Sequence, residues 1–237
     1  MDATNATAAK PQILWIGGWS SSLEVWRGPL ESLYPSWRHG FVAVETVQDL
    51  EPGDLAERVR DLCPEPTRCV VVAWSLGSQL ALRTWNAGLW PEGLGLLAVC
   101  PVVEFCAAEG PWRRIHLERM IRGLGRDREG VLEEFRKLLR EECPEDEARA
   151  WREAAAGIPP EALVRGLELL RDGRLEWIRP GPGLVLVEGA GDRVSPRLEA
   201  VMEAGELAGL RRFVLATGHV PFLEDAEGFG RILEEGR

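Results

Sequence analysis

The chain has 237 residues, with 38 acidic and 28 basic side chains, and its formal net charge at pH 7 is −10. One domain is expected at this length, and a hydrophobic content of 45% supplies a large buried core, which excludes disordered and collagen-like structure. The negative charge balance argues against a general nucleic-acid binder and against a protein held on an anionic membrane.

The cysteines and the first residues of the chain bear on its compartment. Five cysteines include no C-x-x-C pair and cannot all pair with one another; they are Cys63, Cys69, Cys100, Cys106 and Cys143. Three lie in or beside apolar runs, where a free thiol packs as a small hydrophobe. Residues 1–10 lack the basic and then apolar order of a signal peptide, and no apolar run approaches the roughly 20 residues that cross a bilayer. We therefore expect a cytoplasmic monomer in a reducing compartment.

Short apolar runs alternate with helical patterns along most of the chain. The runs predict strands at residues 12–16, 41–44, 69–74, 94–100, 183–187 and 212–216. Several are apolar throughout, which is typical of strands covered on both faces. Helices are predicted over residues 55–63 and from Leu23, Leu76 and Phe222. This alternation predicts an α/β fold with a small, mostly parallel sheet of about six strands.

One long stretch, residues 104–178, interrupts the alternation. It shows only helical patterns: an apolar stripe within residues 131–139, a second helix over 145–156, and a third from Pro159 to Leu170. One crossover between parallel strands needs one helix, and about 75 residues supply at least three. We predict that residues 104–178 form a helical cap, or lid, and that residues 1–103 and 179–237 form the core. Ordinary crossover helices are the alternative.

Residues 69–80 hold the strongest local motif. The strand ends in Ala73-Trp74-Ser75-Leu76-Gly77, and a helix begins immediately. In such a turn the strand and the helix approach closely, so only small side chains fit on either side, and the serine hydroxyl is lifted clear of the backbone. The N–H of Leu76, at the helix N-terminus, points to where an oxyanion would develop. We interpret Ser75 as a nucleophile, with a helix-capping serine as the alternative.

A serine nucleophile needs a general base, and the chain has three histidines. His39 is expected in a loop before the second strand, and His116 lies in the cap region. His219 follows the last strand, where the end of a parallel sheet would present an imidazole. We therefore predict His219 as the base.

The base needs a carboxylate to orient it, and we predict Asp192 for this role. Asp192 lies in a glycine-rich loop directly after a buried strand, and the order Ser75, Asp192, His219 is that of the α/β-hydrolase triad. Glu104, just after the fourth strand, and Glu188, at the end of the same strand as Asp192, are rivals for the same role.

The loop after the first strand, Gly17-Gly18-Trp19, is expected to supply the second oxyanion donor through the Trp19 N–H. It is not a nucleotide phosphate loop, because it lacks both G-x-G-x-x-G and a GK[ST] ending. No cluster of histidine, cysteine and acidic residues has the spacing of metal ligands. We predict no metal and no cofactor.

With these residues the chain resembles the α/β-hydrolase superfamily over nearly its whole length, and within it the pimeloyl-ACP methyl ester carboxylesterases of biotin synthesis. The segments that carry the resemblance are Gly18-Trp19, Trp74-Ser75-Leu76-Gly77, Gly166-Leu167-Glu168-Leu169-Leu170, Gly191-Asp192 and His219-Val220-Pro221-Phe222. The sequence departs from the family at Ala73, which replaces the first glycine of the elbow, and at Gly17, where a histidine is common.

The resemblance implies an α/β-hydrolase fold whose cap is inserted after the strand that follows the nucleophile helix. It implies the triad Ser75, Asp192 and His219, with an oxyanion hole made by the N–H groups of Trp19 and Leu76. It also implies that Trp19 contacts substrate and that Phe135, in the cap, lines an acyl pocket.

A basic segment of the cap bears on a partner. Residues 112–128 carry six arginines against Glu118 and Asp127, although the whole chain is acidic. An acidic acyl carrier protein would be drawn to this segment, and the docking candidates are Arg113, Arg114, Arg119 and Arg122. A solvated helix face is the alternative.

These residues predict a serine carboxylesterase, and the resemblance implies pimeloyl-ACP methyl ester as its substrate. A thioesterase, a lyase of the menaquinone-pathway type and a non-catalytic ligand-binding protein on the same fold are the alternatives.

Overall fold

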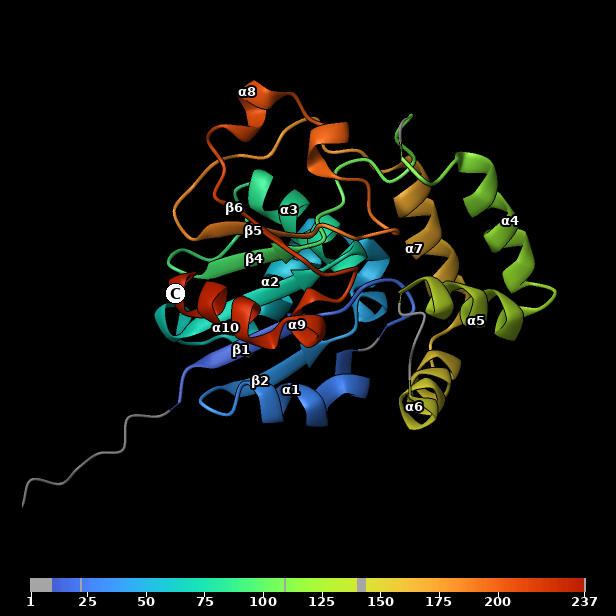
Figure 1. Ribbon diagram of the computed structural model, residues 1–237, viewed down its shortest axis with the longest axis horizontal. Coiled ribbons are helices and arrows are strands. Elements are labelled where there is room, and N and C mark those ends of the chain that lie inside the picture. The colour runs from blue at the N-terminus through green and yellow to red at the C-terminus, as the bar shows by residue number, and fades with distance from the viewer. Residues whose placement is uncertain (1–9, 22, 109, 140–143, 237) are drawn as a thin grey trace, which may run out of the picture.

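The computed structural model describes residues 10–21, 23–108, 110–139 and 144–236. Its centre is a six-stranded sheet in the order β2-β1-β3-β4-β5-β6, in which every neighbouring pair is parallel (Figure 1). The strands are β1 (Gln12–Ile16), β2 (Arg38–Val42), β3 (Cys69–Trp74), β4 (Gly95–Val99), β5 (Leu184–Gly189) and β6 (Arg212–Leu215). The predicted α/β class and the number of strands are confirmed.

The second strand differs from its predicted bounds. It begins at Arg38, three residues before the predicted run, so His39 lies on the strand itself and not in a loop before it. The strand is at the edge of the sheet, and its first residues Arg38, His39 and Gly40 do not form an apolar run. Pairing with β1 makes these residues a strand, which local hydrophobicity does not predict.

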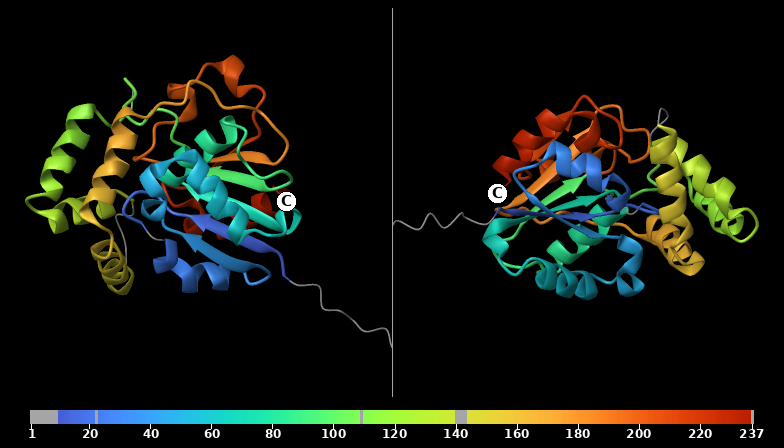
Figure 2. Two further views of the ribbon diagram at one scale, coloured as in Figure 1. Left: turned by 180° about the vertical axis from the view of Figure 1, so that it is seen from behind. Right: turned by 90° about the horizontal axis from the view of Figure 1, so that it is seen from below.

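Helices cover both faces of the sheet. On one face lie α1 (Arg27–Leu33) and α10 (Ala226–Glu235), and on the other lie α2 (Pro52–Leu62) and α3 (Leu76–Asn86), as the right-hand view of Figure 2 shows. The short helices α8 (Ala204–Leu207) and α9 (Pro221–Glu224) lie in the connections around β6. Because both faces are covered, every residue of β3, β4 and β5 is buried.

Among the described residues, four helices lie between β4 and β5, and we call them the cap helices: α4 (Arg114–Leu124), α5 (Arg128–Leu139), α6 (Glu145–Ala156) and α7 (Pro160–Asp172). They stand together at one end of the sheet, beyond the strand tips (Figures 1 and 2). The described part of the predicted stretch without strands thus holds helices joined by turns, with one isolated bridge between Glu104 and Arg174. The division at residues 104 and 178 into cap and core stays a prediction.

The structure bears on two expectations about the compartment: free cysteines and the absence of a membrane-spanning segment. Cys63 and Cys69 are joined in a disulfide, which the expectation of a reducing compartment did not include. Cys100 and Cys106 are free, and Cys143 lies outside the described residues. Among the described helices, none has both the length and the apolar character needed to span a membrane.

Gly166 lets the cap approach the core. A Cβ at this position of α7 would lie 2.6 Å from Trp19 Cδ1 and 3.1 Å from Leu76 Cδ2. Neither neighbour can move freely, because Trp19 is hydrogen-bonded to Leu163 O at 2.8 Å and Leu76 is fully buried. The glycine of the cap segment therefore serves close packing against the two residues that the sequence predicted as oxyanion donors.

We expect Gly166→Ala to lower the free energy of unfolding by about 1–3 kcal/mol, although alanine has the higher helix propensity, because the added methyl overpacks this contact. For a chain of this size each kcal/mol lowers the melting temperature by about 2–4 °C, which calorimetry resolves. Gly157→Ala is the matched control, since its Cβ would meet nothing nearer than 3.4 Å. Equal melting temperatures for the two variants would contradict the packing argument.

Candidate active site

Ser75 occupies the turn between β3 and α3. Its backbone has φ 55° and ψ −120°, a conformation that costs a non-glycine residue about 1–3 kcal/mol. The turn is held because Ser75 N donates to Val99 O at 3.0 Å and Gln79 N donates to Ser75 O at 3.1 Å. A Cβ on Gly77 would overlap the carbonyl oxygen of Gly17. The small residue that the motif requires is therefore explained by contact with the neighbouring loop.

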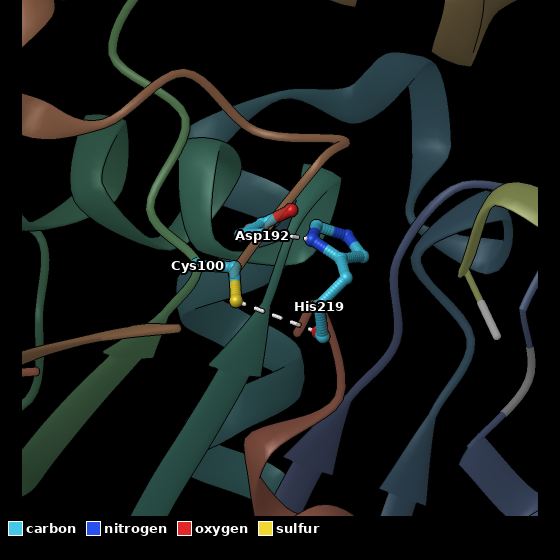
Figure 3. Close-up of side chains that lie close together, drawn as sticks. All are labelled: Cys100, Asp192 and His219. Carbon is cyan, nitrogen blue, oxygen red and sulfur yellow. Dashed lines mark hydrogen bonds and ion pairs between the residues drawn. The ribbon is translucent and has the colours of Figure 1, made fainter. Parts of the chain in front are cut away.

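Asp192 and His219 are in direct contact at the carboxyl ends of β5 and β6 (Figure 3). Asp192 Oδ2 lies 2.8 Å from His219 Nδ1, while Oδ1 accepts hydrogen bonds from the N–H groups of Val194 at 2.7 Å and Ser195 at 3.1 Å. Burial acts to raise the pKa of the Asp192 carboxyl, but the charge of His219 and these hydrogen bonds together hold that pKa below its usual value. The carboxyl is therefore ionised at neutral pH and accepts a hydrogen bond from the Nδ1–H of His219.

The backbone of His219 is anchored, and its second ring nitrogen is free. Trp74 Nε1 donates to His219 O at 2.7 Å, and the Cys100 thiol donates to the same oxygen at 3.4 Å. His219 Nε2 is buried and has no hydrogen-bond partner among the described residues, so no hydrogen bond joins it to Ser75. With Nδ1 bonded to Asp192, Nε2 carries the lone pair that a general base uses. In unliganded enzymes the bond from nucleophile to base is often absent and forms with substrate.

The rival acids have other partners. Glu188 is buried and bonds to Arg212 at 2.6 Å, Arg197 at 3.3 Å and the N–H of Leu198 at 2.9 Å. Glu104 pairs with Arg174 at 3.5 Å. In the described part of the chain, neither carboxylate is bonded to a histidine.

The other two histidines also have separate surroundings. His39 Nδ1 accepts from Trp15 Nε1 at 3.0 Å and its Nε2 lies 3.1 Å from Tyr34 O. Burial lowers the pKa of His39. His116 Nδ1 accepts from the Arg113 N–H at 3.2 Å in the first turn of α4. Both imidazoles are hydrogen-bonded to groups other than those of the Asp192–His219 pair.

Cys100 is a neighbour of the pair that the sequence did not indicate. Its Sγ, a carboxylate oxygen of Asp192 and a ring nitrogen of His219 all lie within 4.8 Å of one another (Figure 3). Burial, with the nearby Asp192, raises the pKa of the Cys100 thiol well above its usual value. A protonated thiol is a poor metal ligand, and the carboxylate is already bonded to the imidazole. The arrangement therefore favours a hydrogen-bonded pair over a metal centre.

The loop after β1 lies directly against the serine turn. A Cβ on Gly18 would be 3.0 Å from Ser75 Cβ, so the glycine allows the approach. The indole of Trp19 is buried, donates to Leu163 O at 2.8 Å and packs edge-on against Phe135 at 4.8 Å between ring centroids. Leu76 is the first residue of α3, and the N–H of such a residue has no partner inside its helix. Both predicted donors are thus placed beside Ser75.

A buried acid behind this loop is a further feature missed from the sequence. Glu45 lies on a 3₁₀ turn (Val44–Thr46) that follows β2, and its Oε1 accepts the Ser20 N–H at 2.5 Å. Burial raises the pKa of Glu45 to about 7, although the backbone N–H donors act in the opposite direction. No motif marks this residue, since its partner is a backbone group from another strand connection.

Two cavities meet at the cap. One, of about 680 Å³, is lined by His219 and Gly191 from the core and by Lys137 and Leu138 from α5. The other, of about 300 Å³, lies between α4 and α5 and is lined mainly by apolar side chains, among them Trp112, Met120, Val131 and Phe135. Glu134 and Leu138 line both cavities. Phe135, predicted for an acyl pocket, therefore lines an apolar cavity that adjoins the one at His219.

The four predicted docking arginines are all exposed, but they differ in their contacts. Arg113 donates to Gly110 O at 2.7 Å, and Arg114 pairs with Asp172 at 2.6 Å. Arg119 lines the cavity between α4 and α5. Within the described ranges, Arg119 and Arg122 form no hydrogen bond or ion pair, so their guanidinium groups face solvent.

We compared the chain with known protein families and sequences. A model of the alpha/beta hydrolase family matches residues 13–232. In sequence the chain is 29% identical over 243 residues to the pimeloyl-[acyl-carrier protein] methyl ester esterase of Nitrosomonas europaea, covering 94% of each chain.

Solved structures share the architecture. An esterase from Exiguobacterium antarcticum matches with a TM-score of 0.74 and 18% identity, covering 95% of this chain and 91% of that one. A bromoperoxidase from Bacillus anthracis matches with a TM-score of 0.73 and 16% identity, over 96% and 91% of the two chains. The likenesses confirm the predicted fold, and because the family model spans nearly the whole sequence, the chain belongs to the alpha/beta hydrolase family.

Proposed function

We propose that the chain is a serine carboxylesterase with Ser75 as nucleophile, His219 as base and Asp192 as the orienting acid. The observation that carries this proposal is the 2.8 Å contact between Asp192 Oδ2 and His219 Nδ1, which leaves the lone pair of His219 Nε2 available. Ser75 follows β3, so it lies at the carboxyl end of the same parallel sheet, and it has the backbone conformation of a nucleophile elbow.

In the proposed reaction Ser75 Oγ attacks the ester carbonyl carbon, and His219 Nε2 accepts the hydroxyl proton. The carbonyl oxygen becomes an oxyanion and is stabilised by the N–H groups of Trp19 and Leu76. The carbonyl re-forms, the bond to the alcohol breaks, and His219 returns the proton to the departing alkoxide. Water then attacks the acyl-enzyme with the same base, which releases the acid and restores Ser75.

For the substrate we propose a methyl ester on an acyl chain held by an acyl carrier protein, the pimeloyl ester being the version named for the Nitrosomonas relative. The apolar cavity beside Phe135 suits an acyl chain, and it adjoins the cavity at His219. Arg119 lies at the rim of that cavity, and Arg122 is one turn further along α4. These two solvent-facing cations are the favoured contacts for an acidic carrier, ahead of the internally bonded Arg113 and Arg114.

Ser75→Ala is expected to remove hydrolysis of short p-nitrophenyl esters, lowering kcat by at least about 10³-fold while the melting temperature is kept. Ser36→Ala, which changes an exposed serine, is the control and should leave kcat unchanged. A folded Ser75→Ala protein with wild-type turnover would refute the proposed nucleophile. A folded wild type without any ester hydrolysis would leave the lyase and ligand-binding alternatives.

Asp192→Asn is expected to lower kcat by about 10³–10⁴-fold, because the amide no longer fixes the imidazole tautomer that serves as base. Glu188→Gln is the matched control, since it changes a buried acid near the end of β5, four residues before Asp192, that is bonded to arginines. It should lower thermal stability and leave kcat within about threefold of wild type. The assignment of the acid is wrong if Glu188→Gln is the variant that loses turnover.

Reversing two charges on α4, with Arg119→Glu and Arg122→Glu together, is expected to raise KM for the carrier-bound ester by about tenfold or more. Kinetics on p-nitrophenyl esters should not change, and added salt should weaken carrier binding by the wild type in the same way. Arg58→Glu with Arg149→Glu makes the same charge change on other exposed helix positions as the control. Equal KM values for both double variants would exclude α4 as the docking surface.

A further inference from the structure

The loop that carries Trp19 is held in place from two sides. On the cap side, the Trp19 indole donates to Leu163 O at 2.8 Å, and Gly166 packs against the ring. On the core side, the peptide between Trp19 and Ser20 is bonded at both ends. Its carbonyl oxygen accepts from Ser21 Oγ at 3.1 Å, and its N–H donates to Glu45 Oε1 at 2.5 Å.

Burying the carboxyl group of Glu45 costs free energy of folding. Only 7% of the residue is exposed, its Oε2 has no hydrogen-bond partner among the described residues, and burial raises its pKa to about 7. An apolar side chain of the same size would avoid the cost of burying the carboxyl group. Apart from its own backbone N–H, the Glu45 carboxyl has as its hydrogen-bond partner in the described part of the chain the Ser20 amide, which lies in the loop beside Ser75.

The amide that Glu45 binds is at a strained position. Ser20 has a φ of 56°, in the left-handed region that side chains other than glycine adopt at a cost. Such a conformation persists where surrounding contacts enforce it. The hydrogen bond from Ser20 N to Glu45 is one such contact, and it fixes the orientation of the peptide that follows Trp19. The direction of the Trp19 N–H depends on the torsions of Trp19, which this peptide and the anchored indole constrain.

We propose that Glu45 is a positioning residue for the oxyanion hole: its buried carboxyl group holds the Ser20 amide so that the neighbouring Trp19 N–H faces the substrate oxygen. This inference rests on the proposed function, because it assigns a purpose to Trp19 in ester hydrolysis. Glu45 itself does not touch the reacting atoms. Its loss leaves the Ser20 N–H buried without an acceptor, and the loop relaxes toward conformations in which Trp19 no longer donates.

Two variants of nearly equal size separate this role from simple packing. Glu45→Gln keeps an oxygen acceptor for the Ser20 amide, whereas Glu45→Leu keeps the volume without an acceptor. On p-nitrophenyl butyrate we expect Glu45→Leu to lower kcat by about 10–100-fold with KM within about threefold of wild type, since an oxyanion donor acts mainly in the transition state. Glu45→Gln should restore kcat to within about threefold of wild type.

Val44→Ala is the matched control, because Val44 is fully buried in the same turn and its apolar side chain cannot accept a hydrogen bond from the loop. It should lower the melting temperature and leave kcat within about threefold. All variants are compared by thermal unfolding, and Glu45→Ala replaces Glu45→Leu if the latter does not fold. The proposal is overturned if the variant without an acceptor keeps wild-type kcat, if Glu45→Gln loses as much as Glu45→Leu, or if Val44→Ala loses kcat equally.

Amide hydrogen exchange over residues 17–21 supplies a readout that needs no turnover. The Ser20 amide should be protected in wild type and in Glu45→Gln, and it should exchange at least about tenfold faster in Glu45→Leu. A folded wild type that hydrolyses no ester would count against the proposed function alone, and exchange would then decide on Glu45. Unchanged exchange in Glu45→Leu would overturn the inference even in an active enzyme.

Discussion

The close approach of two backbone segments at the ends of β1 and β3 is the constraint on which the rest of the site depends. A side chain at Gly77 would collide with the carbonyl of Gly17, and one at Gly18 would lie 3.0 Å from Ser75 Cβ. Parallel neighbours bring the two strand ends together, and the glycines allow the backbones to touch. The serine turn and the loop of Trp19 therefore form one continuous surface, although Trp19 and Trp74 are 55 positions apart in the sequence.

That surface also ties the cap helices to the chemistry of the core. Trp19 belongs to the core by its backbone, yet its indole is bonded to Leu163 and packed against Gly166 of α7 and Phe135 of α5. A displacement of α7 would therefore also move Trp19, which lies beside Ser75. In the proposed enzyme, the position of α7 and the geometry of the oxyanion hole thus depend on the same side chain.

The sequence predicted the elements whose signals are local. Buried central strands are apolar throughout, and the serine turn combines a strand end, small residues and a helix start within a few positions. The Asp192–His219 contact could be anticipated because both residues follow neighbouring parallel strands. The start of β2 could not, since pairing with β1 and not hydrophobicity makes Arg38 and His39 a strand. Contacts between a side chain and a distant backbone amide, as for Glu45, have no pattern in sequence at all.

Three carboxyl groups, those of Glu188, Asp192 and Glu45, are chemically similar but have different surroundings. Glu188 lies near the end of β5, whereas Asp192 and Glu45 lie on the connections that follow β5 and β2 of the same sheet. Glu188 faces two arginines and joins β5 to β6, so its charge is used for structure. Asp192 faces an imidazole and two amides, and the lowered pKa of its carboxyl keeps it ionised, so that it accepts a hydrogen bond from the N–H of the imidazole.

Within the described residues Glu45 forms no ion pair, and burial raises the pKa of its carboxyl to about 7. A group that accepts a hydrogen bond whether or not it is protonated is suited to hold an amide, but not to stabilise an imidazolium, which requires full ionisation. The division of roles between Asp192 and Glu45 thus follows from what each carboxyl group faces. In the proposed enzyme, the protein environment, and not the residue type, distinguishes the acid that orients the base from the acid that orients the loop.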